Sequence, residues 1–496
     1  MYYFVGYNLG SSITGIEKAM INRLKLFKES GKKAKCLFLS WNRFISKFSA
    51  QFMEKQDYIN MYDYFQETIS TVKVEHIDYI TYWEHECNYT VKYVPNSKDI
   101  RVYDKNGIFL MYVRFFDSQR KQLDYINYFD INRRKIKREF YDVRGFLSCS
   151  RILTTNQAVL TEQYFNIKGE IVIEKFFNIE TNDVERIILN YANKQRFFND
   201  ETSLQAYFFE SIYQYGDLFF SDKNIHTSPA FNITNPNIPV IAVLHSTHVK
   251  NIDKVATSNY KNVYKELFNN LNRFKAIIVS THSQKVDVSQ RINNQIPVIN
   301  IPVGFSEDHK INDSKKTPPK KLISVARYSP EKQLHQQIKL IDSLKAEFPE
   351  IQLHLYGFGS EYDKLKHLIK EKHLEENVFL RGFVTDLSKE YEDAYLGIIT
   401  SNMEGFSLAL LECQSYGVPI VSYDIKYGPN ELVKDQVNGY LITKNDENKL
   451  TEKVRYLLNN PQIQQKFSQK SISLAQQYSK ENIIEKWDNT LRFLNT

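Results

Sequence analysis

The chain has 496 residues, of which 42% are apolar and 25% charged, and its formal net charge is +7. This composition excludes a disordered chain, and the length exceeds one ordinary core, so we expect two or three domains. The longest apolar runs fall far short of the roughly 18 residues of a membrane span. The N-terminus lacks the basic start and long apolar core of a secretion signal, so we expect a cytoplasmic protein without a transmembrane segment.

The charge and the cysteines narrow the function classes further. A net charge of +7 permits an acidic partner, but a nucleic-acid-binding protein would show a stronger and more continuous basic surface. The four cysteines are widely scattered, with no C-x-x-C pair and no histidine cluster nearby. This spacing predicts reduced thiols and no structural zinc.

The first residues predict a strand, a glycine-containing turn and a helix. Residues 2–7 are apolar and aromatic, and the turn NLGSSITG holds Gly10 and Gly15. Thr14 and Glu17 form a capping-box pattern that opens a helix over residues 16–29. Such a turn presents backbone N–H groups to a phosphate, although an ordinary turn between a strand and a helix fits this stretch equally well.

Residues 55–210 show hairpin signals in place of helix patterns. Asn106-Gly107 and Lys168-Gly169 each separate two β-prone runs. We therefore predict an antiparallel β-rich insertion, in which no simple internal repeat is evident. Residues 132–151 carry seven Lys or Arg residues against two acids, which fits either a solvated face or a docking surface for an acidic acceptor.

Alternating strand and helix patterns return after about residue 210. Residues 240–245 and 276–281 predict buried parallel strands, and the polar segment 308–321 predicts a linker. A second α/β unit follows, with strands expected at residues 322–326, 352–356, 378–380, 396–400 and 420–423. Two doubly wound halves with a cleft between their strand ends form a natural ligand site.

Three short motifs fall at the predicted strand ends of this second unit. In the first, Arg327 and Lys332 flank Pro330, which is placed like the first residue of a helix. Cations are unfavourable at a helix N-terminus, and a bound diphosphate removes that conflict. The other two, Tyr356–Gly359 (YGFG) and Leu380–Phe383 (LRGF), are strand ends that run into turns, and neither is specific alone.

A fourth motif, SNMEGFSLALLE at residues 401–412, places two glutamates near a helix start. We expect Ser407 to cap a helix over residues 408–416, with the amides of residues 405–407 directed at anionic or hydroxyl oxygens. Glu404 precedes this helix. Glu412 lies little more than one turn into the helix, where its side chain can point back toward the helix start and the amides of residues 405–407.

In their order and spacing, SVARYSPEKQ, YGFG, RGF and EGFSLALLE resemble family 4 of the retaining glycosyltransferases, which have the GT-B fold. The stretches NLGSSITGIEKA, YDVRGFLSCSR and VLHSTHVKNID are most similar to the staphylococcal serine–aspartate-repeat N-acetylglucosaminyltransferases of the Sdg type. The resemblance implies an α/β GT-B fold, with two Rossmann-like domains facing a cleft and an antiparallel β-rich insertion in the N-terminal domain. The implied parts are the N-terminal domain at 1–55 and 210–307, the acceptor-binding insertion at 56–209, the UDP-sugar-binding domain at 318–480, and a C-terminal helix at 481–496. A return of that helix to the N-terminal domain is left open.

The resemblance also implies roles for residues around the donor sugar nucleotide. Arg327 and Lys332 neutralise the diphosphate and the departing UDP, Glu404 faces the sugar as a stabiliser, and Glu412 binds the ribose. Arg327, Lys332 and Glu404 form the expected catalytic set. No D-x-D pair occurs in the chain, so no metal is expected.

The remaining donor contacts are implied in the same way. Gly15 lets the diphosphate approach the backbone, and His248 contacts the donor sugar, although His245 competes for that role. The full set of expected donor-binding residues is Gly15, His248, Tyr356, Gly357, Gly382, Phe383, Gly405, Phe406, Ser407 and Glu412.

The implied reaction moves N-acetylglucosamine from UDP-GlcNAc, a donor substrate, to serine hydroxyls in the Ser-Asp repeats of cell-wall adhesins, with retention and without another cofactor. The expected acceptor-binding residues are Arg133, Arg134, Lys137 and Arg144, and a homo-oligomer formed through the insertion is left open. One alternative is an α-GlcNAc transferase acting on teichoic acid, because a polyol phosphate would suit the same basic cluster. The other is a non-catalytic subunit that only binds the adhesin, which the presence of all the expected catalytic residues disfavours.

Overall fold

The computed structural model describes residues 1–75, 77–307 and 320–495. Contacts within the chain divide it into two compact units. The first contains Met1–Ser11, Ala34–Phe219 and Pro229–Ile238, and the second contains Ser12–Lys33, Phe220–Ser228 and Pro239–Thr496. The boundary passes through strand β14 (Leu218–Ser221) and helix α6 (Asn224–Ile233). The domain limits inferred from the sequence group these segments differently and stay predictions.

The first unit starts with short parallel strands. Strand β1 (Tyr2–Gly6) pairs in parallel with β2 (Ala34–Phe38), which pairs with β3 (Tyr58–Asn60). The helices of this unit are α2 (Ile45–Ser49), α3 (Met61–Phe65), α4 (Tyr79–Thr81) and α5 (Glu201–Ile212). Asn60 starts α3, because its side-chain oxygen accepts the backbone amides of Tyr62 and Asp63.

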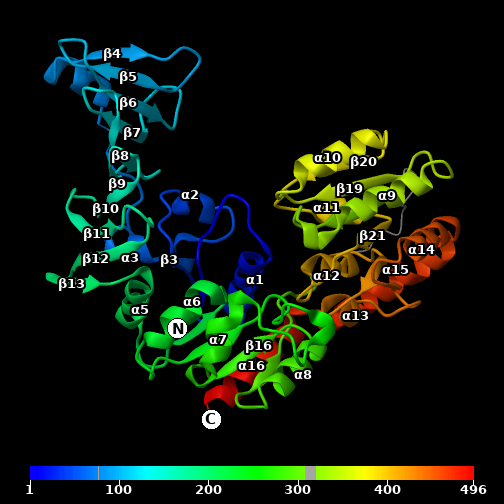
Figure 1. The fold of residues 1–496 in the computed structure, drawn as a ribbon. Helices are drawn as coiled ribbons and strands as arrows, with labels where there is room; N and C mark the ends of the chain where they lie inside the picture. The colour runs from blue at the N-terminus through cyan, green and yellow to red at the C-terminus, as the bar shows by residue number, and fades with distance from the viewer. Residues whose placement is uncertain (76, 308–319, 496) are drawn as a thin grey trace. The chain divides into compact units, whose positions relative to one another are not determined.

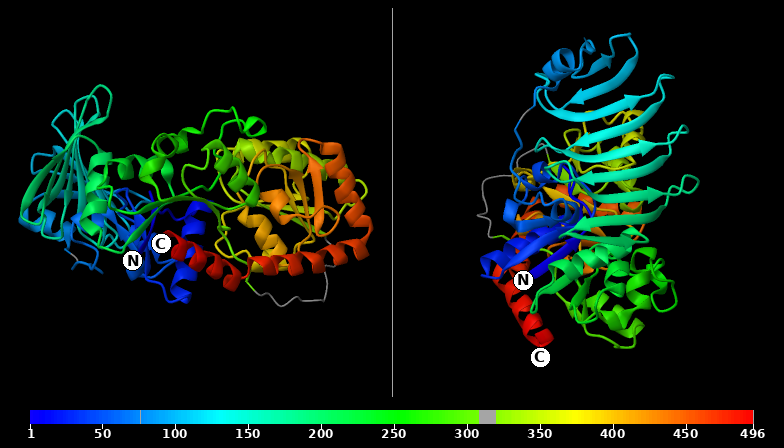
Figure 2. Two further views of the ribbon diagram at one scale, coloured as in Figure 1. Left: turned by 90° about the horizontal axis from the view of Figure 1, so that it is seen from below. Right: turned by 90° about the vertical axis from the view of Figure 1, so that its left-hand side faces the viewer.

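The rest of the first unit is a ten-stranded antiparallel meander in which each strand pairs with the next along the chain (Figure 1). Its strands are β4 (Thr90–Tyr93), β5 (Ile100–Tyr103), β6 (Phe109–Phe115), β7 (Leu123–Phe129), β8 (Lys135–Tyr141), β9 (Leu147–Leu153), β10 (Val159–Phe165), β11 (Ile171–Phe177), β12 (Val184–Tyr191) and β13 (Lys194–Phe198). The right-hand view of Figure 2 shows these strands side by side. The predicted β-rich insertion and both predicted hairpins are confirmed, with Gly107 and Gly169 at positive φ in their turns.

The meander contains a recurrence that the sequence analysis missed. Four consecutive turns of the meander, between β7 and β11, close with the same backbone hydrogen bond, which runs from the amide of residue 130, 142, 154 or 166 to the carbonyl of the fourth residue after it. The fourth residue of each turn has positive φ, and these residues are Arg133, Gly145, Gln157 and Gly169. The turns therefore repeat every 12 residues, and the expectation of no internal repeat was wrong. Only two of the four left-handed positions are glycines, so the usual glycine signal is incomplete.

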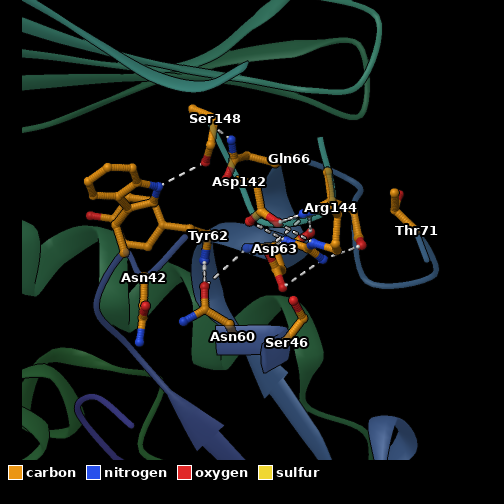
Figure 3. Close-up of polar contacts among 12 residues, drawn as sticks. Asn42, Ser46, Asn60, Tyr62, Asp63, Gln66, Thr71, Asp142, Arg144 and Ser148 are labelled. Carbon is orange, nitrogen blue, oxygen red and sulfur yellow. Dashed lines mark hydrogen bonds and ion pairs between the residues drawn. The ribbon is translucent and has the colours of Figure 1, made fainter. Parts of the chain in front are cut away.

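A buried ion-pair network ties the meander to α3 (Figure 3). Arg144 is only 4% exposed, and its guanidinium donates to Asp63 Oδ1 and to Asp142 Oδ1, each at 2.7 Å. It also donates to the carbonyl of Thr68 at 3.0 Å. Two carboxylates and one carbonyl thus satisfy a charge that would be costly to bury alone.

The second unit begins with α1 (Gly15–Glu29), whose start is one residue before the predicted one. The amide of Thr14 donates to the Glu17 carboxylate at 2.9 Å, as the capping-box pattern predicts. Strands β15 (Val240–Val243), β16 (Ala276–Val279) and β17 (Val298–Asn300) pair in parallel. Helices α7 (Lys265–Asn269) and α8 (His282–Arg291) lie between these strands in the chain, and the last helix, α16 (Lys480–Asn495), packs on α1 through Trp487 and Phe27.

A six-stranded parallel sheet forms the rest of this unit, with order β20-β19-β18-β21-β22-β23. Its strands are β18 (Lys321–Val325), β19 (Gln352–Tyr356), β20 (Val378–Gly382), β21 (Leu396–Ile399), β22 (Ile420–Asp424) and β23 (Gly439–Thr443). Its helices are α9 (Leu334–Leu344), α10 (Tyr362–Glu371), α11 (Ser388–Glu392), α12 (Leu408–Ser415), α13 (Gly428–Leu432), α14 (Glu447–Asn459) and α15 (Pro461–Ala475). The five predicted strands are confirmed to within two residues, and β23 was not predicted.

The sheet order explains where a ligand site is expected. Strands β19 and β20 follow β18 on one side of the sheet, and strands β21, β22 and β23 lie on the other side of β18. The carboxyl ends of β18 and β21 therefore flank the point where the strand order reverses, which is where such sheets bind ligands. Residues 308–319 of the predicted linker lie outside the described residues, and its last residue, Lys321, is the first residue of β18. No helix in the described ranges is long and apolar enough to cross a membrane.

The Arg144 network generates a stability prediction. Arg144→Met keeps most of the side-chain volume but leaves Asp63 and Asp142 buried without a cation, so we expect a loss of about 3–5 kcal/mol. The measurement is the urea midpoint of unfolding followed by circular dichroism. Arg134→Met, which removes an exposed arginine from the preceding turn, is the matched control and should barely move the midpoint. Equal shifts in the two variants would contradict a structural role for Arg144.

Candidate functional site

A cavity of about 500 Å³ lies within the second unit. It is lined by the first turn of α1, the loops that follow β14 and β15, the carboxyl ends of β18 and β19, and the turn that starts α12. Of the residues expected at the donor site or in catalysis, those that line it are Gly15, Arg327, Lys332, Tyr356, Gly357, Phe383, Glu404, Gly405, Phe406, Ser407 and Glu412. The structure thus brings together four motifs and an N-terminal turn that are far apart in the sequence.

The two expected cations reach this cavity from the segment between β18 and α9. Arg327 follows β18 and pairs with Glu331 at 2.8 Å. Lys332 lies in a short 3-10 turn, Pro330–Lys332, because Gln333 has φ of +48° and α9 starts only at Leu334. Pro330 is therefore the first residue of a short helix, as predicted, but this helix is a single 3-10 turn that contains Lys332 and ends before α9.

The two glutamates of SNMEGFSLALLE both face the cavity. Glu404 Oε1 accepts hydrogen bonds from Lys332 Nζ and Ser401 Oγ, each at 2.7 Å. Glu412, the fifth residue of α12, accepts from the Tyr391 hydroxyl at 2.7 Å and pairs with Lys18 of α1. Each carboxylate is therefore held by one cation and one hydroxyl, which fixes its direction.

The turn before α12 offers unsatisfied backbone donors. Ser407 is the N-cap residue, as predicted, but its φ is +73° and its side chain makes no capping bond. Within the described residues, the amides of Gly405, Phe406 and Ser407 donate to no protein group. Amides at the start of a helix that line a cavity are suited to anionic oxygens, because the helix dipole adds to their partial charges.

Two glycines bring backbone segments together around the cavity. A Cβ on Gly405 would lie 2.4 Å from the carbonyl oxygen of His245, and one on Gly357 would lie 1.9 Å from that of Ala326. Glycine is therefore required at both positions by the protein itself. At Gly15 a Cβ would meet no protein atom within 4 Å, so the role of Gly15 in admitting a diphosphate stays a prediction.

The structure distinguishes the two candidate histidines. His245 lines the cavity, and its Nε2 lies 2.7 Å from Asp222 Oδ1, a carboxylate that also binds Arg23. His248 is fully buried behind the cavity wall, against Tyr427, and burial lowers its pKa to about 4. His245 thus lines the cavity and His248 does not, and which of the two contacts the donor sugar stays a prediction. Gly382 is likewise absent from the cavity wall, but its carbonyl accepts the amide of Gly357 at 2.9 Å.

The expected acceptor-binding residues lie in the first unit, and they differ in exposure. Arg133 and Arg134 are exposed in the turn between β7 and β8, and Lys137 on β8 is half-exposed. Arg134 pairs with Asp130 at 2.9 Å and Lys137 with Glu139 at 2.6 Å. Arg144 is buried in the network described above, so it is removed from this set because its guanidinium is enclosed by carboxylates.

Sequence reasoning missed three groups that line the cavity or hold its wall. Lys18 and Asp222 line it directly, and Tyr391 supports Glu412. Lys18 lies one turn beyond Gly15 on α1, a spacing that points it at the same ligand as the turn. Nothing in the sequence links Asp222 or Tyr391 to their partners, which are 23 and 21 residues away. Among the described residues, no group of three or more His, Cys, Asp or Glu side chains is arranged to hold a metal.

Comparison with known proteins adds family information. Residues 305–473 match the family model described as glycosyl transferases group 1. The poly(glycerol-phosphate) alpha-glucosyltransferase of Bacillus subtilis is 27% identical, over 98% of this chain and 74% of that protein. The poly(ribitol-phosphate) alpha-N-acetylglucosaminyltransferase of Staphylococcus aureus is 27% identical, over 80% of this chain and 79% of that protein. The GtfA subunit of the UDP-N-acetylglucosamine–peptide N-acetylglucosaminyltransferase of Streptococcus pneumoniae is 24% identical, over 99% of this chain and 98% of that protein.

Solved structures agree with this assignment. The crystal structure of TarM matches with a TM-score of 0.85 and 25% identity, over 100% of this chain and 98% of that one. The pneumococcal O-GlcNAc transferase GtfA, solved in complex with UDP and GlcNAc, matches with a TM-score of 0.85 and 20% identity, over 99% of this chain and 98% of that one. The chain therefore has the expected GT-B fold, and it is related to the group 1 glycosyltransferases.

Proposed function

We propose that this protein is a retaining glycosyltransferase that moves N-acetylglucosamine from UDP-GlcNAc to serine hydroxyls in acidic Ser-Asp repeats. The observation that carries the proposal is the cavity wall, where Arg327, Lys332 and the free amides of residues 405–407 line the same cavity as Glu404 and Glu412. A diphosphate needs cations and oriented N–H donors, and a ribose needs a carboxylate acceptor for its hydroxyls. One cavity supplies all three.

In this proposal the cations act on the leaving group. Negative charge grows on the UDP as the bond between the sugar C1 and the phosphate oxygen breaks, and fixed cations lower the energy of that transition state. Lys332 and Arg327 provide this charge, and the amides of residues 405–407 bind the phosphate or sugar oxygens. Glu412 holds the ribose, and Glu404 positions the donor sugar.

The proposed bond changes occur on one face of the sugar. The C1–O bond to the diphosphate breaks, the serine oxygen forms the new bond to C1 from the same side, and a donor phosphate oxygen takes the serine proton. This route retains the anomeric configuration without a protein nucleophile or a protein base. Glu404 is bound to Lys332 and Ser401, which suits an oriented, ionised carboxylate that stabilises charge.

The proposed acceptor rests on charge and on the relatives. The GtfA subunits among the relatives are named as peptide N-acetylglucosaminyltransferases, and a Ser-Asp repeat adds one negative charge for every two residues. The turn at Arg133 and Arg134 exposes positive charge that attracts such a chain. A polyol phosphate is the second candidate acceptor, because two relatives are named for poly(glycerol-phosphate) and poly(ribitol-phosphate).

The proposal is tested by direct assay of the two acceptors. Purified protein is incubated with a Ser-Asp peptide or with poly(ribitol phosphate), each with UDP-GlcNAc, UDP-glucose and UDP-galactose in turn. We expect a mass increment of one N-acetylhexosamine per modified serine, with UDP-GlcNAc only. Transfer to the polyol phosphate alone would replace the proposed acceptor, and transfer to neither would favour a non-catalytic adhesin-binding subunit.

The donor half of the proposal is tested at Lys332. Lys332→Met removes a cation that is expected to bind the leaving group, so kcat should fall by about 10²- to 10³-fold. The readout is UDP release in the presence of saturating acceptor. Lys339→Met is the matched control, because Lys339 lies on the exposed face of α9 and pairs with Glu447 at 3.4 Å, away from the cavity-lining residues. Equal losses in both variants would exclude a specific role for Lys332.

The acceptor half is tested by charge reversal. Replacing Arg133, Arg134 and Lys137 with Glu should raise the peptide KM by about tenfold at low salt, since electrostatic attraction becomes repulsion. UDP-GlcNAc hydrolysis should stay nearly unchanged. The control replaces three exposed lysines on other turns of the same sheet with Glu, namely Lys105, Lys168 and Lys194, and so changes the net charge equally. A matching rise in the control would assign the effect to overall charge, and loss of hydrolysis would reject the acceptor role.

A further inference from the structure

Lys261 is a half-buried lysine beside the loop that carries Glu404. Its Nζ lies 3.1 Å from the sulfur of Met403, the residue immediately before Glu404. Its backbone amide donates to the carbonyl of His248 at 2.9 Å. The main chain and the end of the side chain are therefore both held in place at the edge of the SNMEGFS turn.

The charge of Lys261 has no carboxylate partner. Among the described residues, no Asp or Glu oxygen lies within 4.0 Å of its ammonium group. Glu331 is the acid whose field acts on it, but the Glu331 carboxylate accepts the Arg327 guanidinium at 2.8 Å. A thioether sulfur is only a weak acceptor, and burial lowers the Lys261 pKa. A cation in this situation is stabilised by an anion brought by a ligand.

The donor diphosphate already has its own partners. The cations and amides assigned to it line the cavity, and Lys261 does not. Lys261 lies just outside that wall, since Val263 lines the cavity two residues along and Glu404 lines it next to Met403. The anion that remains in the proposed reaction belongs to the acceptor. In a Ser-Asp repeat this carboxylate is on the residue next to the reacting serine, one chain step of about 3.8 Å away.

We propose that Lys261 binds the aspartate carboxylate next to the acceptor serine, and so selects serines with an adjacent acid. The assignment rests on the proposed transfer to Ser-Asp repeats. It differs from the basic turn at Arg133 and Arg134, which would attract a chain by its total charge. Lys261 would instead bind a single carboxylate at a fixed position relative to the reacting hydroxyl.

The test uses two short peptides of equal length and equal net charge. In one the aspartate follows the only serine directly, and in the other it lies four residues further along. Because overall attraction is the same for both, the ratio of their kcat/KM values reports position alone. We expect the wild-type protein to favour the adjacent aspartate, Lys261→Met to lower this ratio by about tenfold, and Lys261→Arg to restore most of it.

Two controls separate the alternatives. UDP affinity, measured by calorimetry, should be the same in wild type and Lys261→Met, which also shows that the variant is folded. Lys265→Met, an exposed lysine one turn along, should leave the peptide ratio unchanged. An unchanged ratio in Lys261→Met, or a loss of UDP affinity, would overturn the Lys261 assignment while leaving the proposed function intact. Absence of transfer to either peptide by the wild-type protein would instead overturn the proposed function and, with it, this assignment.

Discussion

The pairing of positive and negative side chains around the cavity constrains the rest of the site. Each lysine and arginine among its lining residues faces a carboxylate: Lys18 with Glu412, Lys223 with Glu17, Arg327 with Glu331, and Lys332 with Glu404. Without these acids, several like charges around one small cavity would repel each other and destabilise the fold. The acids also hold the cations at fixed positions, so little ordering is needed when an anionic ligand enters. Within the described residues, the amides before α12 have no protein acceptor, and these donors carry no net charge.

Close backbone approach makes this arrangement possible. Gly405 brings the turn before α12 against the carbonyl of His245, and Gly357 brings the end of β19 against that of Ala326. A side chain at either position would push apart the segments that carry Glu404 and Arg327. These two glycines therefore allow the segments that carry Glu404 and Arg327 to lie close to their neighbours, although the glycines themselves carry no charge. The motifs YGFG and EGF contain their glycines for this structural reason, in addition to any contact with a ligand.

Much of the fold, and the gathering of most of the expected donor-site residues around one cavity, followed from the sequence because both depend on local patterns. Parallel strands are continuous apolar runs, and functional turns at their carboxyl ends follow directly in the chain, so SNMEGFSLALLE could be placed from its neighbours alone. Contacts between residues that are far apart in the sequence could not be predicted from such local patterns. The family resemblance favoured His248, whereas the pairing of His245 with Asp222, which follows a different strand, could not be seen in the sequence. Arg144 looked like a surface cation within a basic run, and only the folded position of Asp63, 81 residues earlier, shows that it is buried.

The pairing of Glu404 bears on the proposed transfer of the sugar. The same oxygen, Oε1, accepts both Lys332 and Ser401. Both donors hold this carboxylate oxygen within the protein, so in the proposed reaction it acts as a positioned charge and not as a nucleophile. The same two donors orient the carboxylate for contact with positive charge that develops on the sugar ring. In the proposed reaction Lys332 also stabilises the leaving group, so one ion pair would stabilise opposite charges on the two sides of the breaking bond.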